Sequence, residues 1–230
     1  MVEVVLSAKI ERWFRHQCAA WQQAGVPAPG TVHLRITPAL AEWEIVLLEA
    51  ALDDGLFQPD PERGWEIQLF ADNTQSPYSI FSKGPPPRVL RENVCQLAAA
   101  ARLIYERGWL PSHVALRPTR SEHSAAVGAF DLFVQSPDGH ALIWVETRRS
   151  GVELQKLIAD LGACSRRGPH AHVDCGFPQN HPRHEFARTT RPEYLWAMAP
   201  DADFSFALQH NGSALELEPL RTVPPRSVLE

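Results

Sequence analysis

The 230-residue sequence is poor in cysteine and has no long apolar run, and both absences narrow the class of protein. Its 4 cysteines are too few for the disulfide framework of a small secreted protein. No apolar stretch approaches the roughly 18–20 residues that span a bilayer. The first residues, Met1 to Leu6, lack the basic region and the cleavage site of a secretory signal. We therefore expect a protein without membrane contact in a reducing, cytoplasmic setting.

A strong excess of positive charge is also missing. The formal net charge is −5, and 44% hydrophobic with 21% charged residues is an ordinary globular composition. Residues 1–82 hold 5 Lys/Arg and 11 Asp/Glu, a net charge of −6, so residues 83–230 hold 17 and 16, a net charge of +1. Affinity for a nucleic-acid backbone comes largely from Lys and Arg. The second part is compatible with a polyanion, and equally with a solvated surface of mixed charge.

The change in charge coincides with three consecutive prolines at 85–87, which favour an extended crossing or a linker. The sequence therefore predicts an acidic N-terminal extension or small domain over 1–82 and a second domain over 83–230. Within the first part we expect helices over 4–23 and 38–52, the latter with Pro38 at its start. Short strands over 65–70 and 78–81 follow. The role of this part stays open between a scaffold, a surface for a protein partner and a DNA-contacting lobe.

The second part alternates helices and strands more clearly. Apolar spacing predicts helices over 89–108 and 151–163, a short strand over 114–117 and a closing strand over 204–208. A hairpin lies between the helices, residues 192–198 suit a helix or a strand, and 214–217 suit a strand paired with 204–208. This succession predicts an α/β fold with a mixed central sheet flanked by helices.

No GxSxG elbow, HExxH pair or Gly-rich phosphate loop is present. The most informative segment is the hairpin over 128–148. Its turn, Ser136 to Gly139, has Pro, Asp and Gly where a turn needs them. A four-residue loop would pair Gln135 with His140, Asp131 with Trp144 and Ala129 with Glu146. Asp131, Glu146 and Arg148 then project from one face, with the two carboxylates as diagonal neighbours roughly 7–8 Å apart. A half-exposed hairpin with scattered charges is the alternative interpretation.

Asp131 and Glu146-Thr-Arg148, in this succession of elements, resemble the PD-(D/E)xK or restriction-endonuclease-like nuclease superfamily over roughly residues 89–208. The resemblance implies that Asp131 and Glu146 bind Mg²⁺ or Mn²⁺, with Glu92 or Glu106 from the preceding helix as a further acid. Arg148 stands where the family usually has Lys. Arg holds a phosphate through its planar fork but does not readily deprotonate. The resemblance implies a Mg²⁺-dependent nuclease, acting on DNA rather than RNA, or a catalytically inactive copy that binds nucleic acid or a protein partner.

Three polar residues after the hairpin are candidate substrate contacts. Arg149 follows Arg148 directly. Gln155 lies on the flank of the apolar stripe of the helix over 151–163, from which it could reach a site at the sheet edge. Lys156 lies roughly 150° from the centre of that stripe, so it should face solvent. Exposed polar residues without a function explain Gln155 and Lys156 as well.

A second set of residues has the side chains that zinc prefers, and Cys164, Cys175, His181 and His184 would make a plausible tetrahedral site. Their spacing matches no standard zinc motif, because no CxxC or HxxxH pair is present. A polar loop with two partly buried thiols, or a His-rich surface beside a phosphate-binding face, would explain the same residues.

Overall fold

The structure, a computed structural model, describes residues 7–25, 36–60, 64, 67–69, 78–82, 88–116, 131–165, 175–211 and 214–229. The N-terminal part contains α1 (Ala8–Gln23), α2 (Glu42–Asp53), β1 (Phe57–Pro59) and β2 (Ile67–Leu69). The second part contains α3 (Arg91–Tyr105), η1 (Pro111–His113), β3 (Val114–Leu116), β4 (Leu132–Gln135), β5 (Ala141–Thr147), α4 (Gly151–Ser165), α5 (His181–Thr190), β6 (Tyr194–Ala199), β7 (Ala202–Asn211), β8 (Ala214–Leu220) and α6 (Arg226–Leu229). Among the described helices, none combines the length and the apolar character needed to cross a bilayer.

The second part is built on a six-stranded sheet in the order β3-β4-β5-β6-β7-β8. Neighbouring strands are antiparallel except β5 and β6, which run parallel. A parallel pair needs a long crossover, and α4 and α5 supply it. The predicted α/β fold with a mixed central sheet flanked by helices is therefore confirmed.

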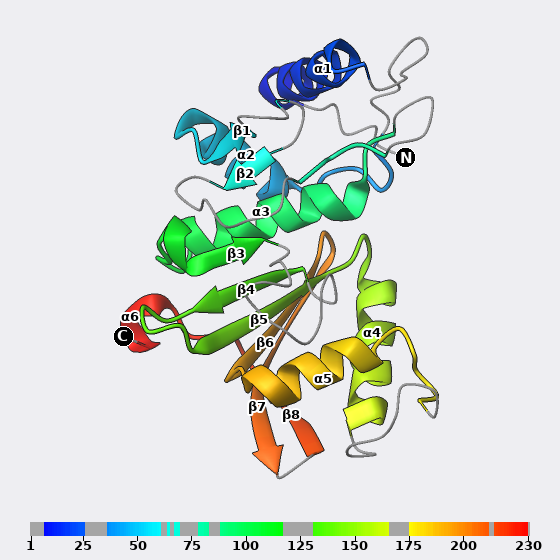
Figure 1. Ribbon diagram of the computed structural model, residues 1–230, viewed down its shortest axis with the longest axis vertical. Coiled ribbons are helices and arrows are strands. Elements are labelled where there is room, and N and C mark those ends of the chain that lie inside the picture. The colour runs from blue at the N-terminus through cyan, green and yellow to red at the C-terminus, as the bar shows by residue number, and fades with distance from the viewer. Residues whose placement is uncertain are drawn as a thin grey trace.

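The two faces of the sheet bury different sets of side chains, because successive residues of a strand point to opposite sides. Leu132 and Val145 belong to the apolar cluster that contains α3 and the N-terminal part. Phe133 and Trp144 belong to the cluster that contains residues of α4 and α5. Figure 1 shows α3 on one side of the sheet, with the N-terminal elements beyond it, and α4 and α5 on the other.

The predicted register of the hairpin is wrong by two residues from Leu132 to Val134 and by one residue at Gln135. Trp144 lies opposite Phe133 rather than Asp131, and Gln135 lies opposite Ala141 rather than His140. The reason is a shorter turn, in which Ser136 already pairs with His140 through a hydrogen bond from Ser136 N to His140 O at 2.9 Å, together with a bulge between Val134 and Gln135. A shift of two residues keeps the side chains from Leu132 to Val134 on their predicted faces, so Asp131 and Glu146 still share one. Ala129, predicted opposite Glu146, lies outside the described residues.

Helix α3 lies between the sheet and the N-terminal part, and 11 of its 15 residues are buried. Its run of small side chains, Ala98 to Ala101, lets other elements pack closely on both sides. A buried ion pair joins it to α2, with Arg91 Nη1 donating to Glu44 Oε1 at 2.8 Å. Near its C-terminal end, the Arg102 guanidinium lies between the rings of Trp43 and Trp196, 5.2 Å and 5.1 Å from the ring centroids.

Several element predictions needed correction. The helix α5 lies in a segment for which no helix was predicted, and of the helix or strand left open for residues 192–198 the structure forms a strand, β6. Pro38 does not start α2, which begins at Glu42; Glu44 Oε2 accepts from Ala41 N at 2.7 Å and so satisfies a backbone donor at the helix start. The proposed crossing at residues 83–87 lies outside the described residues.

Candidate functional site

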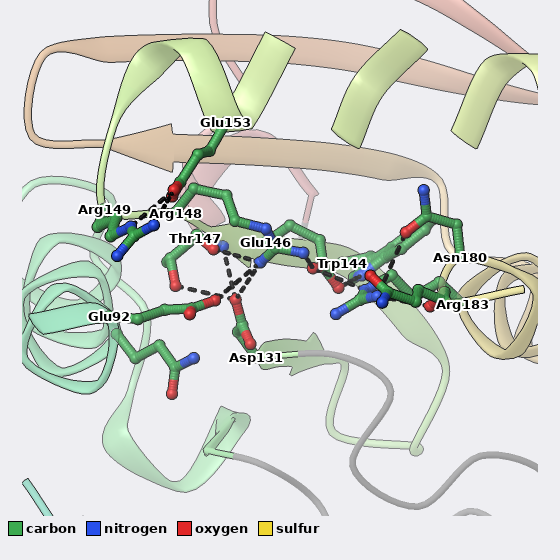
Figure 2. A network of polar contacts seen from close by, with 12 residues as sticks. Glu92, Asp131, Trp144, Glu146, Thr147, Arg148, Arg149, Glu153, Asn180 and Arg183 are labelled. Atoms are coloured by element: carbon green, nitrogen blue, oxygen red, sulfur yellow. Dashed lines mark hydrogen bonds and ion pairs between the residues drawn. The ribbon is translucent and has the colours of Figure 1, made fainter. Parts of the chain in front are cut away.

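An open hollow of about 720 Å³ lies where the C-terminal end of β5 meets the N-terminal ends of α3 and α4 and the turn that leads into α5. Its lining includes charged side chains from all these elements: Glu92, Arg148, Glu153, Lys156, Asp160 and Arg183. Beneath it lie the two predicted hairpin carboxylates, Asp131 and Glu146 (Figure 2). The structure thus brings the predicted acids of the hairpin and of α3 to one place.

Glu146 is the most deeply buried acid of the site, with no exposed surface. Its position on β5 points it to the face covered by α4 and α5, where Trp144 Nε1 donates to its Oε1 at 2.9 Å. Its Oε2 accepts from Arg148 Nη2 at 3.2 Å and from Arg183 Nε at 3.0 Å. Burial raises the pKa of Glu146 to about 7, an effect that Arg183 opposes and the negative charge of Asp131 reinforces.

Asp131 comes directly before β4 and is 6% exposed. Its Oδ2 accepts from the Thr147 backbone N at 2.7 Å and from the Thr147 hydroxyl at 2.9 Å. Arg148 Nη1 lies 3.4 Å from the same oxygen. These contacts fix the carboxylate against the last residue of β5, beside Glu146.

Arg148 occupies the centre of the site. Its Nη1 contacts Glu92 Oε1 at 3.0 Å and also the Thr147 carbonyl oxygen, while its Nη2 contacts Glu146. Burial disfavours its charge, but the carboxylates of Glu146, Asp131 and Glu92 outweigh this and raise the pKa of Arg148. One guanidinium is therefore surrounded by oxygens from α3, the start of β4 and the end of β5 (Figure 2).

Arg183 is a further member of the site that the sequence did not single out. It lies on α5 and binds Glu146 from the side opposite Arg148 (Figure 2). Its Nη1 donates to Gln179 O at 2.8 Å and to Asn180 Oδ1 at 3.3 Å, which holds the guanidinium in place. The sequence showed it only as one of several neighbouring arginines, because its role depends on a helix that was not predicted.

The site is close to electrical neutrality. Glu92, Asp131 and Glu146 contribute three carboxylates against the guanidinium groups of Arg148 and Arg183. A proton on Glu146, whose pKa is about 7, removes the one negative charge in excess. Buried charges are tolerated when they are paired in this way.

The remaining predicted residues are distributed around the hollow. Glu92, rather than Glu106, is the helix acid of the site, since Glu106 pairs with Arg102 at the far end of α3. Lys156 is exposed as predicted and lines the hollow, whereas Gln155 is exposed and is not among its lining residues. Arg149 is exposed and pairs with Glu153 at 2.6 Å; it lines a second hollow, of about 1150 Å³, which shares Glu92 and Glu153 with the first.

Three of the four predicted zinc ligands come together. The ligand atoms of Cys164, Cys175 and His181 all lie within 4.8 Å of one another, and all three side chains are buried. The two sulfur atoms are 3.6 Å apart. His184 is fully buried one turn further along α5 and is not part of this group.

Comparison of the chain with protein-family models, with curated proteins and with solved structures finds no match.

Proposed function

We propose that the chain is a divalent-cation-dependent phosphodiesterase that hydrolyses nucleic acid, DNA rather than RNA, at the hollow above Asp131 and Glu146. The observation that carries the proposal is the convergence of oxygens on the Arg148 guanidinium, from Glu92, Asp131, Glu146 and the Thr147 carbonyl. The succession of a helix, three antiparallel strands, two helices and a strand parallel to the third supports a restriction-endonuclease-like fold for the same part of the chain.

The oxygens around Arg148 fit a hard cation. Mg²⁺ prefers carboxylate and carbonyl oxygens and keeps several of its waters, and the adjoining hollow has room for water and a phosphate group. Asp131 and Glu146 would hold the ion, with Glu92 and the Thr147 carbonyl as further oxygens. When bound, it supplies an activated water and stabilises charge on the scissile phosphate.

Arg148 then has to leave the carboxylates. Its side chain is 14% exposed and lines the hollow, so its guanidinium can turn outward toward a bound phosphate. Arg suits this task because its planar fork matches a phosphate in two hydrogen bonds. Arg183 stays paired with Glu146 and keeps that carboxylate in position, while Lys156 at the rim adds positive charge for the polyanion.

When a cation replaces the Arg148 guanidinium between the carboxylates, the affinity for that cation should depend on pH. Glu146 has to be ionised to bind the ion, and its pKa is about 7. Because binding releases its proton, the affinity for Mg²⁺ or Mn²⁺ should rise about tenfold per pH unit below pH 7 and level off above it. Calorimetric titration of the whole chain at pH 6 and pH 8 measures this. Asp131→Asn should abolish binding, and Glu153→Gln, a substitution at the rim, should leave the pH dependence unchanged.

Cleavage of end-labelled single- and double-stranded DNA and RNA in Mg²⁺ or Mn²⁺ tests the activity itself. The proposal expects metal-dependent cleavage by the wild type, its loss in Asp131→Asn and its retention in Glu153→Gln. Arg148→Lys should increase the rate, because Lys is a compact group that leaves the carboxylates more readily and can exchange a proton. Absence of metal-dependent cleavage by both the wild type and Arg148→Lys would refute the proposal.

The same network supports a second candidate, a catalytically inactive module that binds nucleic acid or a protein partner. In this alternative Arg148 permanently takes the place of the cation, and the nearly neutral cluster is a structural element. It expects no metal binding at Asp131 and no cleavage. Binding of labelled DNA by the wild type without metal ions, together with weaker binding by Lys156→Ala, would favour this alternative.

A further inference from the structure

The geometry of Cys164, Cys175 and His181 points to a structural zinc site, which we propose as a second metal site separate from the hollow. The trio joins three pieces of chain, since Cys164 lies near the C-terminal end of α4, Cys175 in the turn after it and His181 at the first position of α5. Thiolate sulfur and imidazole nitrogen are the ligands that zinc prefers in proteins.

The separation of the two sulfur atoms agrees with a shared zinc ion. With Zn–S bonds of about 2.3 Å and a tetrahedral angle, two thiolates on one ion lie about 3.8 Å apart. The observed Sγ–Sγ distance is 3.6 Å. A disulfide would need about 2.05 Å, so the pair has the spacing of two ligands rather than that of a covalent bond. The ligand nitrogen of His181 completes a trio in which no two ligand atoms are more than 4.8 Å apart.

The surroundings of Cys175 suit a metal-bound thiolate. The Phe177 backbone N donates to Cys175 Sγ at 3.3 Å, and a hydrogen bond of this kind stabilises negative charge on the sulfur and orients it. The trio is shielded from water, with Cys164 0%, Cys175 8% and His181 7% exposed. Burial of all three ligands keeps solvent and substrate away from the ion, which favours a structural role over a catalytic one. His184, fully buried one turn along α5, lies outside this group of three.

The place of the trio in the fold gives the ion a specific task. Between Cys175 and His181 the chain forms the turn whose residues Gly176 to Asn180 line the hollow, and Arg183 follows on the first turn of α5. An ion bound by one ligand from α4, one from the segment before the turn and one from α5 would fix the turn relative to α4. The zinc would thereby position Arg183 against Glu146 without touching substrate itself.

Zinc content and cobalt substitution of the full-length protein test the inference. Protein purified under reducing conditions without chelator should contain one equivalent of zinc. Replacement by Co²⁺ should give a sulfur-to-cobalt charge-transfer band and the intense visible absorption of tetrahedral cobalt. Cys164→Ser should weaken the charge-transfer band and lower zinc affinity at least tenfold. Cys18→Ser, a buried cysteine on α1, is the matched control and should change neither.

The decisive measurement is made on the wild type, so it does not depend on whether a variant folds. Reduced wild-type protein that contains no zinc and shows no charge-transfer band with Co²⁺ would overturn the inference. A mass two hydrogens lower than that of the reduced chain, with Cys164 and Cys175 linked in one peptide, would overturn it in favour of a disulfide. The readout is independent of nucleic-acid cleavage, so failure of the proposed phosphodiesterase and failure of the zinc site are distinguishable.

Discussion

The pKa of Glu146 makes a prediction about how the stability of the protein depends on pH. The carboxyl has a pKa of about 7 in the folded protein against 4.5 for the free group, because it is completely buried. The folded chain therefore keeps the Glu146 proton at pH values where the unfolded chain has lost it. This contribution to stability is complete below pH 4.5 and is lost as the pH rises through 7.

The size of the effect follows from the shift. A difference of about 2.5 pH units, at about 1.36 kcal/mol per unit, corresponds to about 3 kcal/mol. Glu146→Gln keeps the shape of the side chain but has no proton to lose. The free energy of unfolding of the wild type, relative to that of Glu146→Gln, should therefore decrease by about 3 kcal/mol between pH 4.5 and pH 7 and be constant above about pH 8.

Urea unfolding in the presence of a chelator, at half-unit steps from pH 4.5 to 8, measures the difference directly. Other groups that titrate equally in both proteins contribute nothing to the difference between their free energies of unfolding. Glu153→Gln, which changes an acid that pairs with exposed Arg149, should run parallel to the wild type. A difference between wild type and Glu146→Gln that is flat from pH 5 to 7 would refute the reasoning, because it would mean that Arg148 and Arg183 keep Glu146 ionised throughout.

Three further substitutions test the ion pairs. Arg183→Met removes one cation from Glu146 and should destabilise the protein by about 3–5 kcal/mol at pH 8. At pH 5 the loss should be clearly smaller, because Glu146 is then protonated. Equal losses at both pH values in urea unfolding would contradict the ion pair between Arg183 and Glu146. Glu44→Gln leaves the Arg91 charge buried without its counter-ion and should cost about 3–5 kcal/mol. Glu11→Gln, which removes the exposed ion pair with Arg15, should lower the free energy of unfolding by less than about 0.5 kcal/mol in the same assay. Comparable losses in these two variants would mean that burial does not govern the energetics.

The elements with a strong apolar pattern could be predicted from the sequence, as α3, α4 and the hairpin show. The shared face of Asp131 and Glu146 was also correct although the register was not. The reason is that side chains alternate with a period of two, so a shift of two residues moves partners without turning any side chain over. The exact pairing depends on the turn and on the bulge beside Gln135, which local residue preferences do not determine.

The part of the site that could not be predicted lies on α5. The helix sequence contains Pro, His, Arg and Thr, and its buried apolar residues are only Phe186 and Ala187, so it has no recognisable apolar stripe. Arg183 reaches Glu146 across 37 residues of sequence, and nothing local marks that contact. The convergence of Cys164, Cys175 and His181 was easier to predict, because Cys and His are distinctive side chains even where their spacing matches no motif.

The position of α3 between two layers has a consequence for how the chain unfolds and how it can change. Both sides of the helix are covered, one by the sheet and the other by α2 and its neighbours, so removing either layer would leave a long apolar surface in water. The two parts should therefore melt in one cooperative transition rather than in two. A substitution on α3 has to satisfy two packing partners at once, so few residue types fit at its buried positions.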